Sequence, residues 1–255
     1  MSDDLHSDLH DRTLRLTIDR PERRNALNES VISGLIEAIG RADEDRQIRA
    51  IVVTGAGDRA FCAGADLASG TSFAFDYAEP SLGYANLLRR ARACTVPLVA
   101  RVNGACMAGG MGLLAMCDIA IAAGHATFGL PEVKVGLFPM QVLSVLLPLV
   151  PRRVLVQMCL TGESIDAPAA LAAGLVSAVA DPLDAAVDKV LAAILGNSPT
   201  AIRRGLYALK RAESMSFEEA IAFTEGQIGL LALTEDAREG MRAFAERRPP
   251  VWTGK

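Results

Sequence analysis

The sequence predicts an α/β protein, and three observations carry that prediction. Apolar and polar residues alternate over 14–18, which is the period of a half-buried strand. Asn28 can cap a helix that begins at about Glu29 and has apolar residues at helical spacing. A buried strand follows over 48–54 and ends in a glycine-rich turn. Strand and helix patterns then alternate to about residue 180, which is typical of an α/β fold.

The later elements continue this alternation and then become helices alone. We expect a helix over 84–94, a strand over 97–102, a short helix over 109–117 and a strand over 118–123. From residue 181 onward the sequence predicts four amphipathic helices, at 182–195, 200–212, 217–233 and 236–246. The run 196–199 (Gly-Asn-Ser-Pro) breaks the helical pattern. We therefore expect a core of residues 1–195 and a helical region of residues 196–255.

Composition and charge exclude several classes of protein. The 255 residues include 26 Lys+Arg and 30 Asp+Glu, and the net charge of −4 argues against non-specific nucleic-acid binding. No apolar run approaches the ~20 residues of a membrane span, and the acidic segment 1–11 lacks the pattern of a signal peptide. The five cysteines form no C-x-x-C pair, which suits a reducing compartment. We expect a cytoplasmic protein without membrane contact.

The three histidines narrow the chemistry further. His6 and His10 lie in a polar leader, so His125 is the only one that we expect inside the folded chain. The sequence has no H-E-x-x-H, H-x-H or Cys/His cluster, and we expect no metal site. A Ser-His-Asp or Cys-His enzyme would depend on His125 alone. Acid–base chemistry in this chain therefore points to a carboxylate.

One glycine-rich turn has the outline of a nucleotide site. Residues 54–60 follow a strand and contain the spacing G-x-G-x-x-A. A dinucleotide-binding turn leads into a helix, but residues 61–66 have no helical periodicity. We interpret 54–60 as a plain turn.

Two segments of small residues also follow predicted strands, at 61–67 and 103–112. Small side chains let a ligand approach the main chain, and the start of a helix presents unpaired N–H groups. If the segments face each other, they can offer two N–H donors to one oxygen, which defines an oxyanion hole. Taken alone, each segment fits a tight turn or close helix packing better.

Glu132 is a single carboxylate in a strongly apolar stretch. Pro131 can occupy the first position of a helical turn that contains Glu132. Taken alone, this pattern fits a surface glutamate favoured by the helix dipole. The alternative is a partly buried base whose pKa is raised by desolvation.

Five segments together resemble the crotonase superfamily, the enoyl-CoA hydratase/isomerase family. They occur in the expected order and span nearly the whole chain: DRPERRNALN (19–28), AFCAGADL (60–67), VNGACMAGGMGLLAMCDIAIA (102–122), ATFGLPEVKVGLFP (126–139) and EGMRAFAERRPP (239–250). The resemblance implies a spiral of ββα units with a C-terminal helical region that builds homotrimers, usually stacked into homohexamers. It also implies an acyl-CoA thioester as the substrate and no cofactor besides the CoA of that substrate.

The resemblance further implies roles for individual residues. The backbone N–H groups of Ala65 and Gly109 would hold the thioester oxygen, and Glu132 would be the catalytic carboxylate. The positions that match the CoA-binding segments are Arg23, Arg24, Ala26, Leu27, Arg59, Ala63, Asp66, Phe244 and Arg247. The acyl pocket would be lined by Phe128, Leu130, Phe138, Pro139 and Met140, each of which fits ordinary core packing better when taken alone.

One position departs from the hydratase pattern. Classical hydratases use a further glutamate three residues after the position of Gly109, and here that residue is Gly112. One carboxylate can move a proton from one carbon to another, whereas hydration needs a water that is both positioned and deprotonated. The chain therefore resembles the single-glutamate enoyl-CoA isomerases more than the classical hydratases. A second carboxylate could still come from elsewhere, with Asp76 and Glu79 as candidates.

Three functions stay open at this point. The leading one is an acyl-CoA enzyme that isomerises an enoyl-CoA or hydrates it in an atypical way. The absence of a side chain at Gly112 also allows a non-catalytic acyl-CoA-binding or regulatory protein. A thioester hydrolase or dehalogenase on the same scaffold would need a nucleophile at another position.

Overall fold

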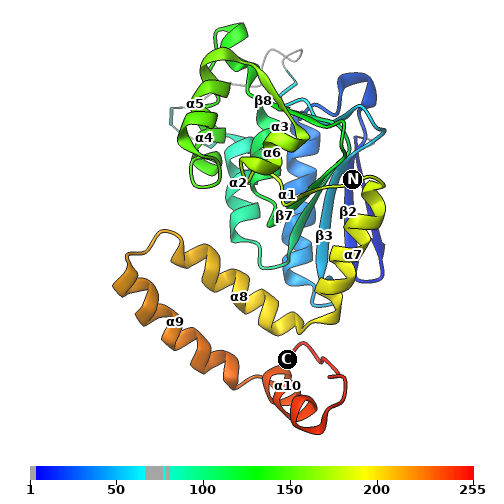
Figure 1. The fold of residues 1–255 in the computed structure, drawn as a ribbon, viewed down its shortest axis with the longest axis vertical. Helices are drawn as coiled ribbons and strands as arrows, with labels where there is room; N and C mark the ends of the chain where they lie inside the picture. Colours follow the sequence, from blue (N-terminus) through cyan, green and yellow to red (C-terminus); the bar gives the residue numbers. More distant parts are fainter. Residues whose placement is uncertain (1–3, 67–76, 79–80) are drawn as a thin grey trace.

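The computed structural model describes residues 4–66, 77–78 and 81–255, which form two β-sheets enclosed by helices (Figure 1). The strands are β1 (Leu5–His10), β2 (Thr13–Ile18), β3 (Ala50–Gly55), β4 (Ala60–Cys62), β5 (Leu98–Val102), β6 (Ala105–Met107), β7 (Ile119–Ala122), β8 (Thr127–Gly129), β9 (Ser164–Asp166) and β10 (Ala178–Val179). The helices of the core are α1 (Glu29–Glu44), α2 (Gly83–Ala93), α3 (Gly109–Ala115), α4 (Met140–Leu146), α5 (Arg152–Thr161), α6 (Ala167–Ala172) and α7 (Leu183–Gly196). The described chain also has two 3₁₀ helices, η1 (Pro21–Arg23) and η3 (Pro131–Val135). It ends with the helices α8 (Pro199–Ala212), α9 (Phe217–Ala232) and α10 (Glu235–Glu246).

The larger sheet has six strands in the order β1-β2-β3-β5-β7-β10, and the smaller sheet has four in the order β4-β6-β8-β9. The pairs β1–β2 and β8–β9 are antiparallel, and the other pairs of neighbours in the described sheets are parallel. The predicted α/β class is confirmed. No helix in the described part of the chain is both long and apolar enough to cross a membrane.

Polar caps define where the predicted helices begin. The side chain of Asn28 accepts a hydrogen bond from the N–H of Val31 at 2.9 Å, which confirms the predicted start of α1. Ser198, Ser216 and Thr234 cap α8, α9 and α10 in the same way. Each cap supplies an acceptor for one N–H that has no partner within its helix.

Alternate residues of the central strands face two different layers of the core. In β3, Ile51 and Val53 pack with α1, α2 and the smaller sheet, whereas Ala50 and Val52 pack against α7. Helices α1 and α2 lie together on one face of the larger sheet, and α7 covers the other face (Figure 1). A strand that is buried on both faces has an apolar run instead of an alternating pattern, which explains the sequence 50–53.

The chain winds through the two sheets as a spiral. Strands β3, β5 and β7 of the larger sheet lead into β4, β6 and β8 of the smaller sheet, respectively. The first of these pairs is followed by α2, the second by α3 and the third by η3. This is the ββα spiral that the resemblance implies. It brings the carboxyl ends of the parallel strands β4, β6 and β8 to one edge.

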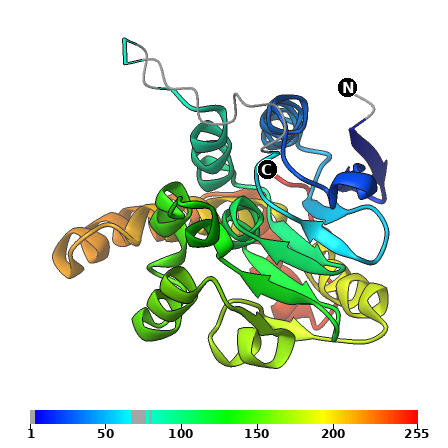
Figure 2. The same cartoon turned by 90° about the horizontal axis from the view of Figure 1, so that it is seen from above.

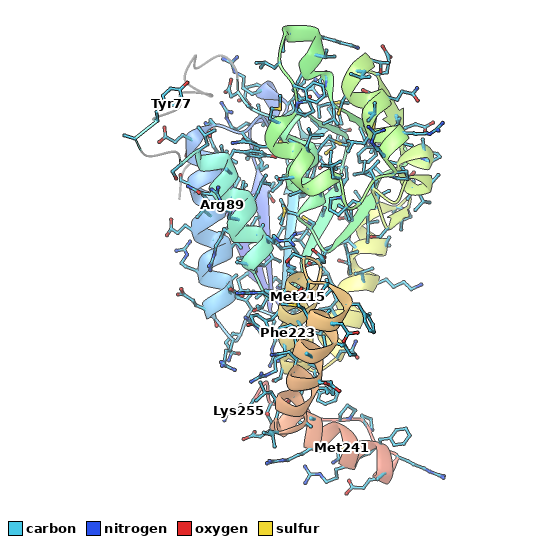
Figure 3. The ribbon with its side chains drawn as sticks, turned by 90° about the vertical axis from the view of Figure 1, so that its left-hand side faces the viewer. Tyr77, Arg89, Met215, Phe223, Met241 and Lys255 are labelled. Atoms are coloured by element: carbon cyan, nitrogen blue, oxygen red, sulfur yellow. The ribbon has the colours of Figure 1, made fainter. Side chains whose placement is uncertain are left out.

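The last three helices lead away from the sheets. In α8 and α9 no residue is buried, although the two helices pack against each other with the rings of Tyr207 and Phe223 6.1 Å apart. Figure 2 shows this pair as an arm that extends beyond the core. Met241 of α10 lies at the opposite end of the molecule from Tyr77, and Phe223 of α9 lies between them (Figure 3). The C-terminal helical region is therefore confirmed, and its treatment as a separate domain from residue 196 stays a prediction.

One expectation about the N-terminal segment is wrong. The residues that we expected to form a polar leader include β1, which pairs with β2 along its whole length. Leu5 is buried beside Gly34 of α1, whereas His6 and His10 are exposed. His6 Nε2 lies 2.7 Å from a carboxylate oxygen of Asp19. The strand was missed because its second half is exposed on both faces, so the sequence there shows no apolar alternation.

Candidate active site

Three candidate residues lie near one another because they follow three neighbouring parallel strands. Ala65 follows β4, Gly109 follows β6 and Glu132 follows β8, and β6 pairs with both other strands. In open parallel sheets, the carboxyl ends of the strands form the edge at which ligands bind. The N–H of Ala108 also donates to the carbonyl oxygen of Gly129 at 2.9 Å. This hydrogen bond joins the segment that leads to Gly109 to the segment that leads to Glu132.

The N–H of Ala65 is directed away from the main chain that supports it. A parallel bridge to Leu27 uses the two neighbours of Ala65: Leu27 N–H donates to Gly64 O at 2.7 Å, and Asp66 N–H donates to Leu27 O at 2.9 Å. Successive N–H groups of an extended chain point to opposite sides, so the N–H of Ala65 points away from Leu27. A Cβ atom placed on Gly109 would lie 3.6 Å from this nitrogen.

Gly64 permits the two main chains to approach so closely. Its φ of +94° belongs to the region that favours glycine. A Cβ atom there would lie 2.7 Å from the Cβ of Ala108 and 3.0 Å from the nitrogen of Gly109. Ala108 itself has φ 50° and ψ −123°, a conformation that L residues adopt rarely and that clusters at functional sites.

Gly109 supplies the second N–H. It is the first residue of α3, so its N–H has no acceptor within that helix. The residues that follow, 110–114, are buried and hold the start of the helix in place. Two N–H donors that converge on one point can stabilise an oxygen on which negative charge develops.

Glu132 lies at the second position of η3, directly after Pro131, as predicted. Its Oε2 atom is buried and has no hydrogen-bond partner among the described residues. Burial raises the pKa of the carboxyl group, and a hydrogen bond from its own backbone N–H opposes this shift only in part. Buried polar atoms without a partner are rare, and carboxylates with a raised pKa cluster at catalytic sites.

Tyr84 belongs to this site, and sequence reasoning missed it. Its hydroxyl donates to the carbonyl oxygen of Gly109 at 2.5 Å, and a Cβ atom on Gly112 would overlap with the same hydroxyl. Burial raises the pKa of Tyr84 well above its usual value, and Cys62, Cys106 and Glu132 act in the same direction. No local pattern marks Tyr84, because its role depends on how the first turn of α2 lies beside α3.

Two arginines that we expected to bind CoA flank one small cleft. Arg24 and Arg59 line a cleft of about 130 Å³ together with Asn25 and Gly57. Arg23 is exposed and lies one residue before Arg24, at the end of η1. The structure therefore brings basic groups of the first and second expected CoA-binding segments together.

The other positions of these two segments hold the segments to each other. The N–H of Ala63 donates to the carbonyl oxygen of Arg24 at 3.0 Å, and Arg20 donates to the carbonyl oxygen of Ala26 at 2.7 Å. Arg20 also donates to Asp66 at 2.8 Å, in a partly buried ion pair. Leu27 forms the bridge described above.

Phe244 and Arg247 lie far from these segments within one chain. Both belong to the end of α10, and Phe244 is 87% exposed. Figure 1 shows α10 at the opposite end of the molecule from α3 and β8. The folded monomer does not bring these two residues to the site.

The expected acyl-pocket residues differ in their surroundings. Phe128 and Leu130 are fully buried in the core, and Phe138 packs against its edge. Pro139 is buried, whereas Met140 is 70% exposed.

The remaining candidates are one histidine, two acidic residues and one turn. His125 is exposed, and its Nε2 lies 2.9 Å from the carbonyl oxygen of Asp58. Asp76 and Glu79 lie outside the described residues. The turn 54–60 leads into strand β4 and not into a helix. Within 4–66, 77–78 and 81–255, no group of three His, Cys, Asp or Glu side chains is placed to hold a metal ion.

Comparisons with known proteins identify the family of the chain. The profile of the enoyl-CoA hydratase/isomerase family matches residues 10–255. An enoyl-CoA hydratase of Mycobacterium tuberculosis is 37% identical over 247 residues, covering 93% of this chain and 92% of that protein. A 2,3-dehydroadipyl-CoA hydratase of Escherichia coli is 35% identical over 254 residues, covering 96% of each chain.

Solved structures with a similar fold are also named enoyl-CoA hydratases. The crystal structure of an enoyl-CoA hydratase from Mycobacterium smegmatis superposes with a TM-score of 0.90 at 32% identity, covering 98% of this chain and 99% of that one. An enoyl-CoA hydratase structure from Bacillus anthracis gives the same TM-score at 25% identity, covering 99% of this chain and 100% of that one. By sequence and by fold, the chain belongs to the enoyl-CoA hydratase/isomerase family, within the crotonase superfamily.

Proposed function

We propose that the protein is an enoyl-CoA isomerase that moves a double bond with one glutamate. The observation that carries this proposal is the buried, unpartnered Oε2 of Glu132, which follows β8 beside the strand that leads to Gly109, with glycine at position 112. Isomerisation needs one group that takes a proton from one carbon and returns it to another. It needs no second carboxylate, no cofactor and no metal.

The proposed reaction begins with a 3-enoyl-CoA thioester whose carbonyl oxygen accepts hydrogen bonds from the N–H groups of Ala65 and Gly109. Glu132 removes a proton from C2, and the electron pair of that C–H bond forms a dienolate with negative charge on the thioester oxygen. Each N–H donor to such an oxygen is typically worth ~3–4 kcal/mol. The carbonyl then re-forms, and C4 takes the proton back from Glu132. The double bond has moved from C3=C4 to C2=C3, and the carboxylate is regenerated.

The raised pKa of Glu132 supports this role. A carboxyl group that must first accept and then donate a proton works best when its pKa lies near the working pH. Burial shifts the pKa of Glu132 in that direction. Because Oε2 has no hydrogen-bond partner among the described residues, an interaction with the substrate would not have to displace one.

Hydration of a 2-enoyl-CoA is the second candidate, because several relatives at 33–37% identity are named hydratases. Hydration would require Glu132 both to hold a water and to deprotonate it, or a second carboxylate from outside the described residues. Asp76 and Glu79 are the residues of that segment that we named from the sequence.

We propose that CoA lies along the two joined segments. Arg23, Arg24 and Arg59 would pair with phosphate groups, and the main chain at Ala26, Leu27, Ala63 and Asp66 would border the rest of the ligand. The shared cleft of Arg24 and Arg59 supports this placement. Phe244 and Arg247 would reach CoA only from another copy of the chain.

A trimer or hexamer of this chain is part of the same proposal. Helix α9 has no buried residue, yet it carries large exposed apolar side chains, among them Phe217 (76% exposed), Ile228 (63%) and Leu233 (67%), the last just past its end. An apolar surface of this kind usually lies in an interface between proteins. The five free cysteines suit a reducing compartment, so we propose the cytoplasm as its location.

Initial rates with a 3-enoyl-CoA and a 2-enoyl-CoA test the proposal. We expect the 3-enoyl-CoA to be converted to the 2-enoyl isomer faster than the 2-enoyl-CoA is hydrated, and free CoA not to be released. Faster hydration would favour the second candidate. Tight binding without turnover would favour an acyl-CoA-binding protein, and rapid release of CoA would favour a thioester hydrolase.

A further inference from the structure

Tyr84 contacts Gly109 of the proposed oxyanion site at two points. Its Oη donates to the carbonyl oxygen of Gly109, and its ring carbon Cε2 lies 3.7 Å from the Cβ position of that glycine. The nitrogen of Ala65 lies 3.6 Å from the same position. The phenol is therefore bonded to the residue that supplies one N–H donor, and both Cε2 of Tyr84 and the nitrogen of Ala65 lie within 4 Å of the Cβ position of that residue.

Tyr84 also fills the space beside Gly112. A Cβ atom on Gly112 would overlap with the hydroxyl oxygen, and it would lie 3.3 Å from Cζ of Tyr84 and 3.4 Å from Cγ2 of Val142. A side chain at position 112 can therefore exist only if the phenol moves. Glycine at 112 is the condition under which the hydroxyl of Tyr84 reaches Gly109.

The chemistry of a phenol differs from that of the carboxylate expected there. Tyr84 has one hydroxyl proton, which it donates to Gly109, and burial keeps the phenol protonated. Its oxygen can still accept a hydrogen bond from a water or a substrate hydroxyl. It has no charge with which to remove a proton from that water, whereas a carboxylate at this place could act as a base.

We propose that Tyr84 is the positioning residue that selects the reaction. It takes the place of a second carboxylate, fixes Gly109 through its hydroxyl, and leaves Glu132 as the only group among the described residues that exchanges a proton with the substrate. Tyr84 acts through Gly109 and through the space it fills, without a proton transfer of its own. This inference rests on the proposed isomerase function.

A glutamate introduced at position 112, with and without the phenol of Tyr84, tests the inference through the ratio of the two reaction products. We compare Gly112→Glu with the double variant Tyr84→Ala/Gly112→Glu and measure hydration of a 2-enoyl-CoA against isomerisation of a 3-enoyl-CoA. The ratio of hydration to isomerisation should be at least ~10-fold higher in the double variant, because only removal of the phenol gives the new carboxylate room. An equal ratio in the two variants would overturn the inference.

Tyr84→Phe keeps the ring and removes only the hydroxyl. We expect kcat for isomerisation to fall ~2–10-fold, which is the usual worth of one hydrogen bond, while KM and the product ratio stay unchanged. Tyr207→Phe, on the exposed arm, is the matched control and should have wild-type kinetics. A Tyr84→Phe variant with unchanged kcat would contradict the positioning role.

A measurement without substrate separates this inference from the proposed function. Gly112→Ala should lower the melting temperature of the wild-type chain by more than it lowers that of the Tyr84→Phe variant, because the overlapping oxygen is then absent. Equal losses in both backgrounds would overturn the predicted conflict between the two side chains. Failure of the proposed function would instead be seen in the wild-type protein, as an absence of isomerisation.

Discussion

The hydroxyl of Tyr84 occupies the space that a side chain on Gly112 would enter. The same hydroxyl is hydrogen-bonded to Gly109, so the phenol is held in that space by the segment that would bind the thioester oxygen. Position 112 is where classical hydratases have their further glutamate. In this chain the neutral hydroxyl of Tyr84 takes that place, and the proposed reaction uses Glu132 to move the proton.

Removal of the carboxylate charge of Glu132 should abolish catalysis while binding persists. Glu132→Gln keeps the size of the side chain but cannot accept a proton. We expect kcat to fall by ~10²–10⁴-fold, the usual contribution of general acid–base catalysis, with the Kd for acyl-CoA changed little. The matched control is Glu163→Gln, because Glu163 is an exposed glutamate paired with Lys134 at 3.5 Å. Full activity of Glu132→Gln on both enoyl-CoA substrates would contradict the assignment.

The activity should depend on pH through the raised pKa of Glu132. The carboxyl group acts first as a base, so kcat/KM should rise with pH as the group ionises. Because burial raises its pKa, this rise should be centred above the ordinary value for glutamate of about 4.3. A profile of kcat/KM against pH measures the midpoint. A midpoint at or below the ordinary value would contradict a desolvated base.

The same shift predicts that Glu132 costs stability at neutral pH. With a folded-state pKa above the unfolded one, the folded protein binds more protons in the window between the two values, so stability falls as pH rises through that window. Glu132→Gln removes this cost. Its melting temperature relative to wild type should therefore be higher at pH ~8 than at pH ~4. An equal difference in melting temperature between variant and wild type at both pH values would show that burial does not destabilise the carboxylate.

Gly64→Ala should disrupt the oxyanion site more than it disrupts the fold. The added Cβ would lie 2.7 Å from that of Ala108 and 3.0 Å from the nitrogen of Gly109. We expect kcat/KM to fall by ~10²–10³-fold, as when one oxyanion donor is lost. Gly174→Ala is the control for backbone strain, because Gly174 has φ +74° and only an ordinary contact at 3.6 Å. It should cost ~1–2 kcal/mol of stability and leave kcat/KM unchanged.

A charge on the exposed face of α9 should dissociate the assembly. Ile228 is 63% exposed in one chain, and burial against another copy would make an arginine there costly. Light scattering should find a trimer or hexamer for the wild-type protein and a smaller species for Ile228→Arg. Glu225→Arg adds the same side chain at an exposed polar position of α9. A monomeric wild-type protein would contradict the proposed assembly.

The longer elements were predictable from the sequence because their patterns are local. The alternation over 14–18, the Asn28 cap and the four C-terminal amphipathic helices each depend on residues within one or two turns. The strands β4, β6, β8 and β9 have three residues each, too few for a periodic pattern, and β10 has two. Strand β1 was missed because its exposed half offers no apolar alternation.

The site was predictable in part for the same reason. Ala65, Gly109 and Glu132 follow strands and belong to segments of unusual composition, so the sequence marked each of them. Gly112 was marked as a departure, but the sequence could not show what fills the space beside it. Tyr84 lies 28 residues earlier on another helix, and only the packing of the fold brings its hydroxyl to that space.

A crystal structure of the protein with a bound, slowly reacting acyl-CoA analogue would test the central claim most directly. We predict that the thioester oxygen lies ~2.7–3.1 Å from the nitrogens of Ala65 and Gly109, with Glu132 as the only carboxylate within hydrogen-bond reach of C2 and C4. We also expect the hydroxyl of Tyr84 to remain hydrogen-bonded to Gly109. A second carboxylate, such as that of Asp76 or Glu79, hydrogen-bonded to a water at C3 would contradict the account and identify a hydratase.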